Sequence, residues 1–255
     1  LTKQTAYPMT SQPSETNLKR QEISSVLDNV LDPELDASVS ELGFANITSI
    51  EDTCVTIELR LPTFFCSANF AWIMCSDAKV AVEKLYWVTD AKIVLLDHFA
   101  MKKINHGVQH GLSFDEVFGL SKVENFEQMR IAFKEKAFAK RQAELLNALR
   151  KLKIDHERIC RLSVPQLRLL KNKAKSQTEF SELIERYLDI RLEVFAKGKL
   201  PEFAITRTNG SPLEQDEVLD YLREVRRISG SILANGEMCR ILMKERYSDG
   251  GQISF

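Results

Sequence analysis

The chain has 255 residues, 44% hydrophobic and 28% charged, which is enough for one large folded domain or two smaller ones. Its 35 Lys and Arg against 36 Asp and Glu leave a net charge of -1, so the composition provides no general attraction to nucleic acid. The apolar runs are shorter than the ~20 residues of a membrane-spanning helix and no signal peptide opens the chain, so we expect no membrane association.

The first part of the chain alternates between helix and strand patterns. Residues 1–15 are rich in Thr, Ser, Pro and Gln, which predicts a flexible tail. The spacing of hydrophobic residues then predicts a helix, two strands, a helix and a third strand, over 16–31, 44–50, 53–61, the stretch after Cys66, and 90–97. This order predicts an α+β domain over residues 16–120, in which a small mixed sheet packs on helices.

The remainder, residues 121–255, has the pattern of a mostly α-helical accessory domain. Amphipathic spacing indicates helices over 123–153, 155–162, 164–173, 178–196, 215–228 and 231–247, with a break between the last two at Gly230. Asn209-Gly210 predicts a short β-hairpin near 203–213. A long amphipathic helix can pair within the chain or across a homodimer, and the pattern leaves both open.

One stretch, LRLPTFFCSANFAW at 59–72, has the pattern of a strand end, a tight turn with a cysteine and a helix start. A thiol at this place lies near the positive end of the helix dipole, which favours the thiolate form of Cys66. The alternative is a buried cysteine that packs beside Phe64, Phe65 and Phe70. Taken alone, the stretch favours the packed cysteine, because free cysteines are among the most buried residues.

The segment 97–119 contains three of the four histidines, His98, His106 and His110. The last two are four residues apart, so on a helix they share one face and can form a two-histidine metal clamp. The alternative is a loop, favoured by the two glycines in NHGVQHG, in which the histidines cap or pack. A nucleophilic pair of Cys66 and His98 is a further alternative.

The five cysteines are scattered, without the CxxC spacing of a zinc site or the even number of a disulfide framework, which favours a reducing cytoplasm. Apart from Cys66, none has a partner at ligand spacing. We therefore interpret the others as core or incidental residues, namely Cys54, Cys75, Cys160 and Cys239.

The sequence VLDPELDASVSELGF resembles the opening signature of the iron–sulfur cluster assembly domain found in SufT and PaaD proteins, with Asp32-Pro33-Glu34 followed by Leu42-Gly43. That family also has a Thr-x-x-x-Cys turn after a strand. Here the turn 63–66 is one residue shorter, and the family's Cys-Pro is Cys-Ser. Its usual Pro-x-Trp after the third strand is replaced by Asp97-His98-Phe99. The resemblance covers residues 18–100.

The departures suggest a divergent branch. The segment after Asp97 and the helical part resemble the accessory proteins encoded beside propane-type binuclear iron monooxygenases. The resemblance implies a cytoplasmic protein that handles labile iron or an iron–sulfur cluster for a client metalloenzyme, here a monooxygenase hydroxylase subunit. Thiolate, carboxylate and imidazole groups suit such a metal, and the candidate ligands are Cys66, Asp32, Glu34, His98, His106 and His110. For the two carboxylates the alternative is structural, since they can accept hydrogen bonds from backbone N–H groups.

Three hypotheses follow. The first is a non-enzymatic maturation factor that relays iron through Cys66 and docks its client on the helical part. The second is a metal-free, client-specific chaperone or scaffold. The third is a small cysteine-dependent enzyme, although the sequence has no phosphate-binding glycine loop, no GxSxG elbow and no HExxH motif.

Overall fold

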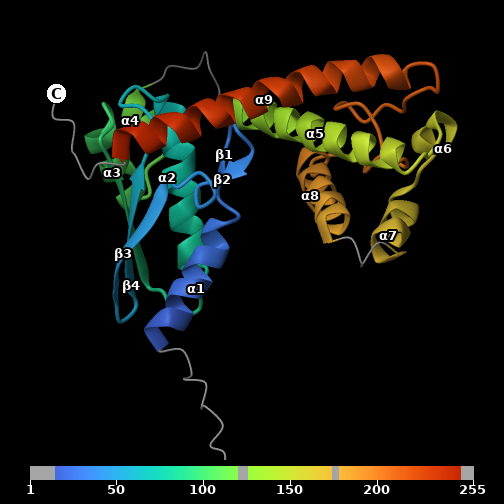
Figure 1. The fold of residues 1–255 in the computed structure, drawn as a ribbon. Coiled ribbons are helices and arrows are strands. Elements are labelled where there is room, and N and C mark those ends of the chain that lie inside the picture. Colours follow the sequence, from blue (N-terminus) through green and yellow to red (C-terminus); the bar gives the residue numbers. More distant parts are fainter. Residues whose placement is uncertain (1–14, 120–125, 174–177, 248–255) are drawn as a thin grey trace, which may run out of the picture.

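The computed structural model describes residues 15–119, 126–173 and 178–247. The predicted tail, residues 1–15, lies outside the described residues except for its last position. Two long helices, α5 (Phe126–Lys151) and α9 (Val218–Tyr247), run side by side, and two lobes lie on the same side beneath them (Figure 1). We call these the N-terminal lobe and the helical lobe.

The N-terminal lobe contains α1 (Glu15–Leu27), β1 (Leu31–Asp32), β2 (Ala37–Ser38), β3 (Ala45–Glu51), β4 (Cys54–Arg60), α2 (Ala68–Glu83), β5 (Asp90–Leu96), α3 (Met101–Gln109) and α4 (Phe114–Phe118). Strand β4 pairs antiparallel with β3 and parallel with β5, which makes a small mixed sheet. The short strands β1 and β2 pair separately. The predicted α+β arrangement followed by a mostly helical region is confirmed.

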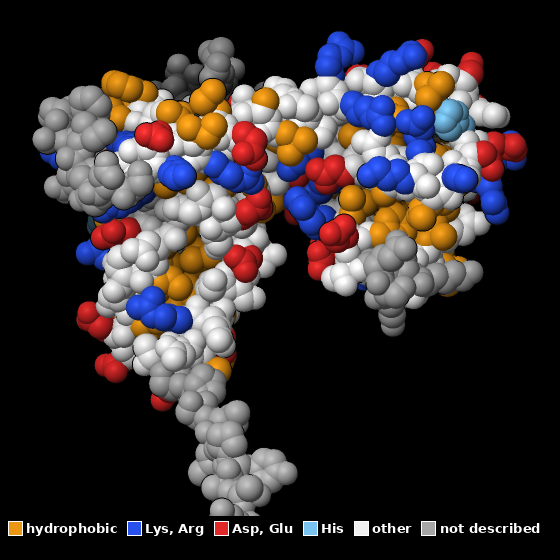
Figure 2. Space-filling model, viewed as in Figure 1, with side chains coloured by type: hydrophobic (Ala, Val, Ile, Leu, Met, Phe, Trp, Pro, Cys, Tyr) orange, Lys and Arg blue, Asp and Glu red, His pale blue; other side chains and the backbone are white. Residues whose placement is uncertain are grey.

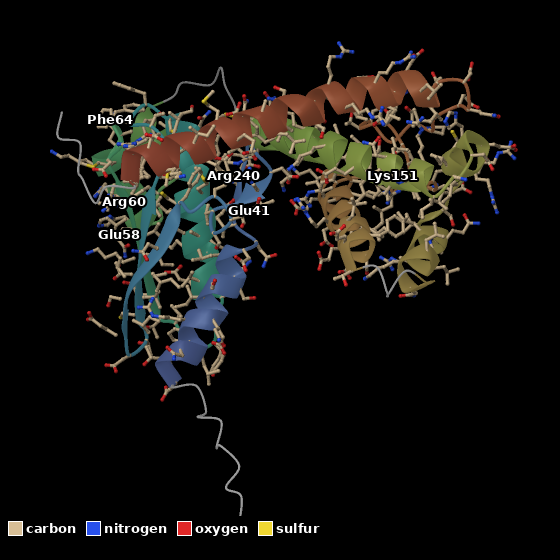
Figure 3. The ribbon with its side chains drawn as sticks, in the orientation of Figure 1. Glu41, Glu58, Arg60, Phe64, Lys151 and Arg240 are labelled. Carbon is tan, nitrogen blue, oxygen red and sulfur yellow. The ribbon has the colours of Figure 1, made fainter. Side chains whose placement is uncertain are left out.

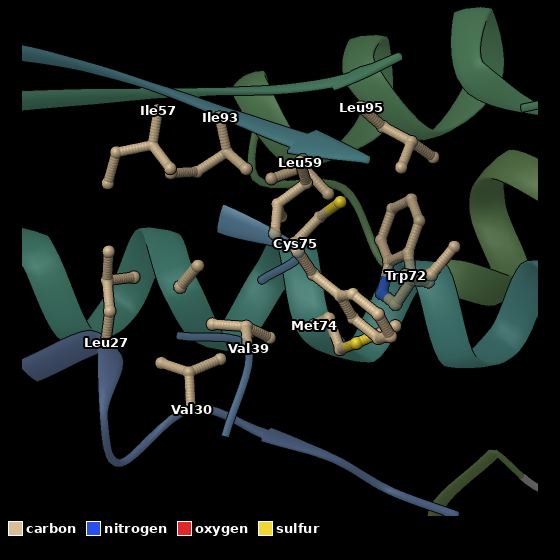
Figure 4. Close-up of a cluster of buried hydrophobic side chains, with 14 of the residues drawn as sticks. Leu27, Val30, Val39, Ile57, Leu59, Trp72, Met74, Cys75, Ile93 and Leu95 are labelled. Atoms are coloured by element: carbon tan, nitrogen blue, oxygen red, sulfur yellow. The ribbon is translucent and has the colours of Figure 1, made fainter. Parts of the chain in front are cut away.

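The core of this lobe follows from the alternation along β4. Val55, Ile57 and Leu59 are buried while the residues between them are partly exposed, so one face of the sheet covers α2 (Figure 4). Burying a side chain of this size contributes about 1.5–3 kcal/mol. Cys75 of α2 lies within this core, and burial raises the pKa of its thiol. Its interpretation as a core cysteine is confirmed.

The helical lobe contains α6 (His156–Cys160), α7 (Val164–Lys173) and α8 (Thr178–Val194), together with parts of the two long helices. Its buried side chains form a second hydrophobic cluster around Phe138 and Tyr187. Among the described residues, the predicted hairpin near 203–213 is limited to one antiparallel bridge between Thr206 and Pro212.

Helix α9 is continuous from Val218 to Tyr247, so the predicted break at Gly230 is wrong. A glycine inside a helix costs only about 1 kcal/mol relative to alanine, and packing against α5 can outweigh that cost. The continuity carries the end of α9 back to the N-terminal lobe (Figure 1), where Cys239 and Met243 pack against the first core. Residues that the sequence assigned only to the helical domain therefore contact the N-terminal lobe.

Charged side chains of both signs are mixed over the face in Figure 2, in keeping with the near-zero net charge. Within the part of the chain that the structure describes, no helix is long and apolar enough to cross a membrane.

Candidate functional site

Cys66 lies in the turn between β4 and α2, immediately before Ser67, the N-cap residue of α2. The turn is held by the Cys66 N–H, which donates to the Thr63 carbonyl at 3.4 Å. The Cys66 Sγ lies 3.3 Å from the Thr63 Oγ1. The side chain is half-buried, so the thiol is positioned by its neighbours yet remains reachable. This location matches the predicted strand end, turn and helix start.

His98 fixes this turn from the end of β5. Its Nε2 donates to the Cys66 carbonyl at 2.7 Å, and its Nδ1 accepts the Ala100 N–H at 3.1 Å. The side chain is only 1% exposed, and burial lowers the pKa of His98, so the neutral Nε2–H form is favoured. Both ring nitrogens are occupied, and neither bonds to the Cys66 sulfur. The geometry favours a positioning role, and ligation by His98 stays a prediction.

An aromatic surface adjoins Cys66. Phe65 is 79% exposed and Phe99 is 52% exposed, and their rings stack with centroids 6.4 Å apart. Phe64 meets Phe65 edge to face at 5.0 Å. Exposed aromatic side chains that adjoin each other are uncommon without a partner, because they leave apolar area in water. The alternative of a buried cysteine packed beside Phe64, Phe65 and Phe70 holds in part, because Cys66 and Phe70 pack half-buried against the core whereas Phe65 is exposed.

Asp32 lies at the end of β1, in the turn that contains Glu34. Its Oδ1 accepts the N–H groups of Glu34 and Leu35, both at 2.9 Å, so the structural role considered for this carboxylate is present. The side chain is 6% exposed, and burial raises the pKa of Asp32 from 3.8 to about 6. The side chain of Glu34 is half-buried. A role of Asp32 or Glu34 as a metal ligand stays a prediction.

The end of α9 brings a second cysteine to this region. Arg246 donates to the carbonyls of Leu61 and Asp97, each at 2.9 Å, and so ties α9 to the ends of β4 and β5. Two turns earlier on the helix, Cys239 lies near Asp32, Cys66 and Glu34. Burial and the negative charge of these groups, in that order, raise the pKa of Cys239 to about 11.

Cys239 was interpreted from the sequence as a core or incidental residue, and its half-buried side chain does pack against the core of the N-terminal lobe. Cys239, Met243 and Arg246 have the i, i+4, i+7 spacing of one helix face, which is the only sequence signal that could have placed them together. This spacing does not determine which surface that face of α9 packs against.

His106 and His110 lie on α3 and at its C-cap, where both are exposed. Their ring centroids are 4.3 Å apart, and His110 Nδ1 donates to the His106 carbonyl at 2.7 Å. The neighbouring Gln109 donates to Asp90 at 3.2 Å, at the start of β5, whereas Asn105 donates to the Leu95 carbonyl at 3.0 Å, near the end of that strand. Among the described residues, the histidine pair belongs to no group of three metal-ligating side chains, and ligation by His106 and His110 stays a prediction.

Metal-ligating groups do not form a ready coordination shell. Among the described residues, no three His, Cys, Asp or Glu side chains are arranged to hold a metal ion. The donor set around Cys66 is thiolate and carboxylate, which fits iron chemically. Any cargo would have to draw these side chains together, as in a site that binds transiently.

A cleft of about 230 Å³ borders Asp32 and lies between α2, α5 and α8. Two ion pairs line it: Arg130 with Asp77 at 2.6 Å, and Lys134 with Glu193 at 3.0 Å. The cleft was not predicted, because its walls come from both lobes.

Comparison with known proteins supports the N-terminal resemblance. Residues 20–94 match the sequence profile of a family described as iron–sulfur cluster assembly protein. The match includes the Asp-Pro-Glu turn, the Cys66 turn and α2, and it ends before His98 and the helical lobe. A search of curated proteins found no match. A search of solved structures also found none.

Proposed function

We propose that this protein, whose N-terminal part matches the iron–sulfur cluster assembly family, is a non-enzymatic maturation factor that relays iron or an iron–sulfur unit to a client metalloenzyme. The family match supports a general role in metal-cluster maturation. Cys66 holds the cargo through its thiolate, and the carboxylates of Asp32 and Glu34 are the further candidate ligands.

The observation that carries the proposal is the setting of Cys66. Its backbone is held by the neutral imidazole of His98, while its thiol stays half-exposed beside the aromatic surface of Phe65 and Phe99. A partner that covers the two rings brings its own ligands to the thiol. Cargo can then pass by ligand exchange, with no change in oxidation state required of the protein.

The client we propose is the hydroxylase subunit of a binuclear iron monooxygenase. This narrower assignment rests on the resemblance of segment 97–119 and the helical part to accessory proteins of such enzymes. The outer face of α9 supports docking by the helical part, because it exposes Leu233, Met238 and Ile241 toward its C-terminal half. This face and the aromatic surface form two apolar areas on which a client can rest.

Co-expression with the client hydroxylase tests the proposal. Cys66→Ser should abolish client activation and lower the iron that the purified client retains. Cys54→Ser is the matched control, because Cys54 is an exposed cysteine at the start of β4, at the opposite end of the strand from the Cys66 turn. Client iron that is unchanged by Cys66→Ser contradicts the iron relay.

A metal-free chaperone is the second candidate. It is favoured by the exposed aromatic surface together with the lack of a three-ligand metal group among the described residues. Under this hypothesis Cys66→Ser leaves client activation and client iron unchanged. Phe65→Ser combined with Phe99→Ser, in contrast, lowers the yield of folded client. Under the iron relay, both changes lower client iron.

A cysteine-dependent enzyme has less support. The base of a nucleophilic pair must reach the sulfur, whereas His98 Nε2 is bonded to the Cys66 carbonyl and its Nδ1 to Ala100. Turnover of a substrate by the purified protein alone would favour this third hypothesis over the other two.

A further inference from the structure

We infer that the outer face of α9 binds a second copy of this chain, so that two molecules associate through antiparallel α9 helices around a two-fold axis. The inference goes beyond the proposed function, because it requires neither Cys66 nor a cargo. The proposed client uses the same face of α9, so the dimer is the form expected while no client is bound.

Contacts on one side of α9 fix its rotation about its own axis. Arg240 pairs with Glu41 at 2.7 Å, and Figure 3 shows these two residues facing each other below α9. Arg246 donates to the carbonyls of Leu61 and Asp97, each at 2.9 Å. Both lobes lie beneath α9, so neither lobe covers the opposite side of the helix (Figure 1).

The opposite side of α9 carries a regular row of exposed residues, which we call the α9 seam. Its members are spaced alternately four and three positions apart, which keeps them on one face of the helix. They are Arg227, Ser231, Ala234, Met238, Ile241 and Glu245. The two large apolar side chains in the middle of the seam are 57% and 55% exposed. Alternate spacing of this kind is the pattern by which two helices pack along each other.

The side chains of the α9 seam complement one another in size when two copies run antiparallel. A two-fold axis at the level of Gly236 places Ala234 opposite Met238 of the second copy. It also places Ser231 opposite Ile241 of the second copy. Each layer therefore combines a small side chain with a large one, which allows close packing. In a parallel pair every residue meets its own copy, so the small residues face each other and leave gaps.

The charges at the two ends of the α9 seam favour the same direction. In the antiparallel arrangement Arg227 lies opposite Glu245 of the second copy, and the two-fold axis repeats this pair. Both residues are exposed, and neither has an ion pair with another described residue of its own chain. A parallel pair sets like charges against each other at both ends. Glu237, at the edge of the seam near the axis, is already paired with Arg240 at 2.6 Å.

The other long helix, α5, is paired within the chain. It packs against α8 and α9, which resolves for α5 the choice between pairing within the chain and pairing across a homodimer. Helix α9 packs on α5 and the lobes with the face opposite the α9 seam, so the seam is available to a partner. Because the seam matches itself in both size and charge, the partner that fits it is a second copy, which uses the same surface in return.

Sedimentation equilibrium of the full-length purified protein, over the micromolar to submillimolar range, measures this association. We expect a monomer–dimer equilibrium with a dissociation constant in the micromolar range, because one helix from each copy makes a smaller interface than the standard size of about 1,200–2,000 Å². Ala234→Glu puts a charge into an apolar layer and should leave the protein monomeric throughout this range. If the unaltered protein is also monomeric throughout, the inference is overturned and the face is left to the client.

Charge reversal tests the antiparallel direction. Arg227→Glu alone, or Glu245→Arg alone, sets like charges opposite each other at two symmetric positions and should raise the dissociation constant about tenfold. The double variant, Arg227→Glu with Glu245→Arg, restores opposite charges and should return the dissociation constant to that of the unaltered protein. Lys92→Glu is the matched control, because it makes the same change of charge at an exposed residue of β5 and should leave the association unchanged.

The substituted positions of α9 are exposed, so the variants should keep the fold, and circular dichroism checks this. A folded Ala234→Glu protein that still dimerises overturns the inference, as does a double variant that associates no better than the single variants. The iron relay is tested separately by client iron in Cys66→Ser, so a monomeric protein leaves that relay standing.

Discussion

Arg141 of α5 binds Asp36, in the loop after Asp32 and Glu34, through a buried ion pair between the two lobes. Its Nη2 lies 2.6 Å from Asp36 Oδ1, and its Nε lies 3.1 Å from both carboxylate oxygens. Lys140 adds a contact at 3.4 Å and also donates to the Asp36 carbonyl at 3.0 Å. The helical part therefore holds the loop that positions the candidate carboxylates.

Arg141→Met tests this contact. The change leaves a buried carboxylate with Lys140 at 3.4 Å and the half-exposed Arg186 at 3.8 Å, and breaking a buried pair in this way costs about 3–5 kcal/mol. We expect the free energy of unfolding in urea to fall by that order. Arg161→Met is the control, because its pair with Glu157 is exposed and such pairs contribute less than about 1 kcal/mol. Equal effects of the two changes would mean that the Asp36 pair does not join the lobes.

Asp32→Asn should change how stability depends on pH. Because burial raises the pKa of Asp32 from 3.8 to about 6, the folded state binds this proton more tightly than the unfolded state. Stability from this group is therefore present below pH 4 and is lost as the pH rises to about 6. Asparagine keeps an oxygen for the N–H groups of Glu34 and Leu35 but carries no charge.

At pH 7 we expect Asp32→Asn to be more stable than the unaltered protein by up to about 3 kcal/mol, since that is the energy of a pKa change of this size. Urea unfolding at a series of pH values from 4 to 7.5 measures it. Glu34→Gln serves as the control and should retain the decrease in stability between pH 4 and 6. Parallel curves for Asp32→Asn and the unaltered protein would rule out a buried carboxylate at this position.

His98→Ala should loosen the turn that holds Cys66. It removes two hydrogen bonds and leaves the Cys66 carbonyl and the Ala100 N–H without this partner, which costs about 2–3 kcal/mol. We also expect faster alkylation of Cys66 by iodoacetamide, located by mass spectrometry. His110→Ala, at an exposed histidine, is the control and should alter neither quantity appreciably.

The contribution of His98 to stability changes with pH in the opposite direction from that of Asp32. Burial lowers the pKa of His98, so the folded state resists protonation, and stability is lost as the pH falls below the ordinary value of 6.5. His98→Ala should lack this loss. A variant that keeps it would show that another group is responsible.

Two glycine substitutions should act in opposite directions. At Gly107 of α3, an added Cβ would lie 2.5 Å from Val117 Cγ2 and 2.6 Å from the Trp72 ring, so Gly107→Ala should destabilise the N-terminal lobe by about 1–3 kcal/mol. At Gly230 of α9 an added Cβ meets nothing within 4 Å, so Gly230→Ala should stabilise the protein by up to about 1 kcal/mol. Thermal unfolding measures both. Destabilisation by Gly230→Ala would argue against a continuous α9.

The elements of the N-terminal lobe were predictable because they depend on local periodicity. The alternation of β4 fixes which side chains face α2, and Pro62 and Ser67 bound the turn that presents Cys66. The capping box of Ser113 and Glu116 is also local, and it starts α4, which ends at Phe118 with Gly119 as its C-cap. These features need only neighbouring residues to form.

The composition of the candidate site was only partly predictable. Sequence alone placed Cys66 in its turn and Asp32 in the loop before it, yet it also grouped His106 and His110 with Cys66. The histidine pair lies exposed at the end of α3, and no group of three metal-ligating side chains among the described residues joins it to the cysteine. A spacing along the chain does not say which side chains of other elements a histidine pair will meet.

What the tertiary structure alone decided is the meeting of residues more than a hundred positions apart. Arg141 reaches Asp36, and Arg246 reaches the carbonyls of Leu61 and Asp97, because α5 and α9 run unbroken between the two lobes. Periodicity shows that a helix has an apolar face but carries no information about the surface that this face will cover. That choice depends on the packing of the whole chain, and here it packs the last turns of α9 against the N-terminal lobe.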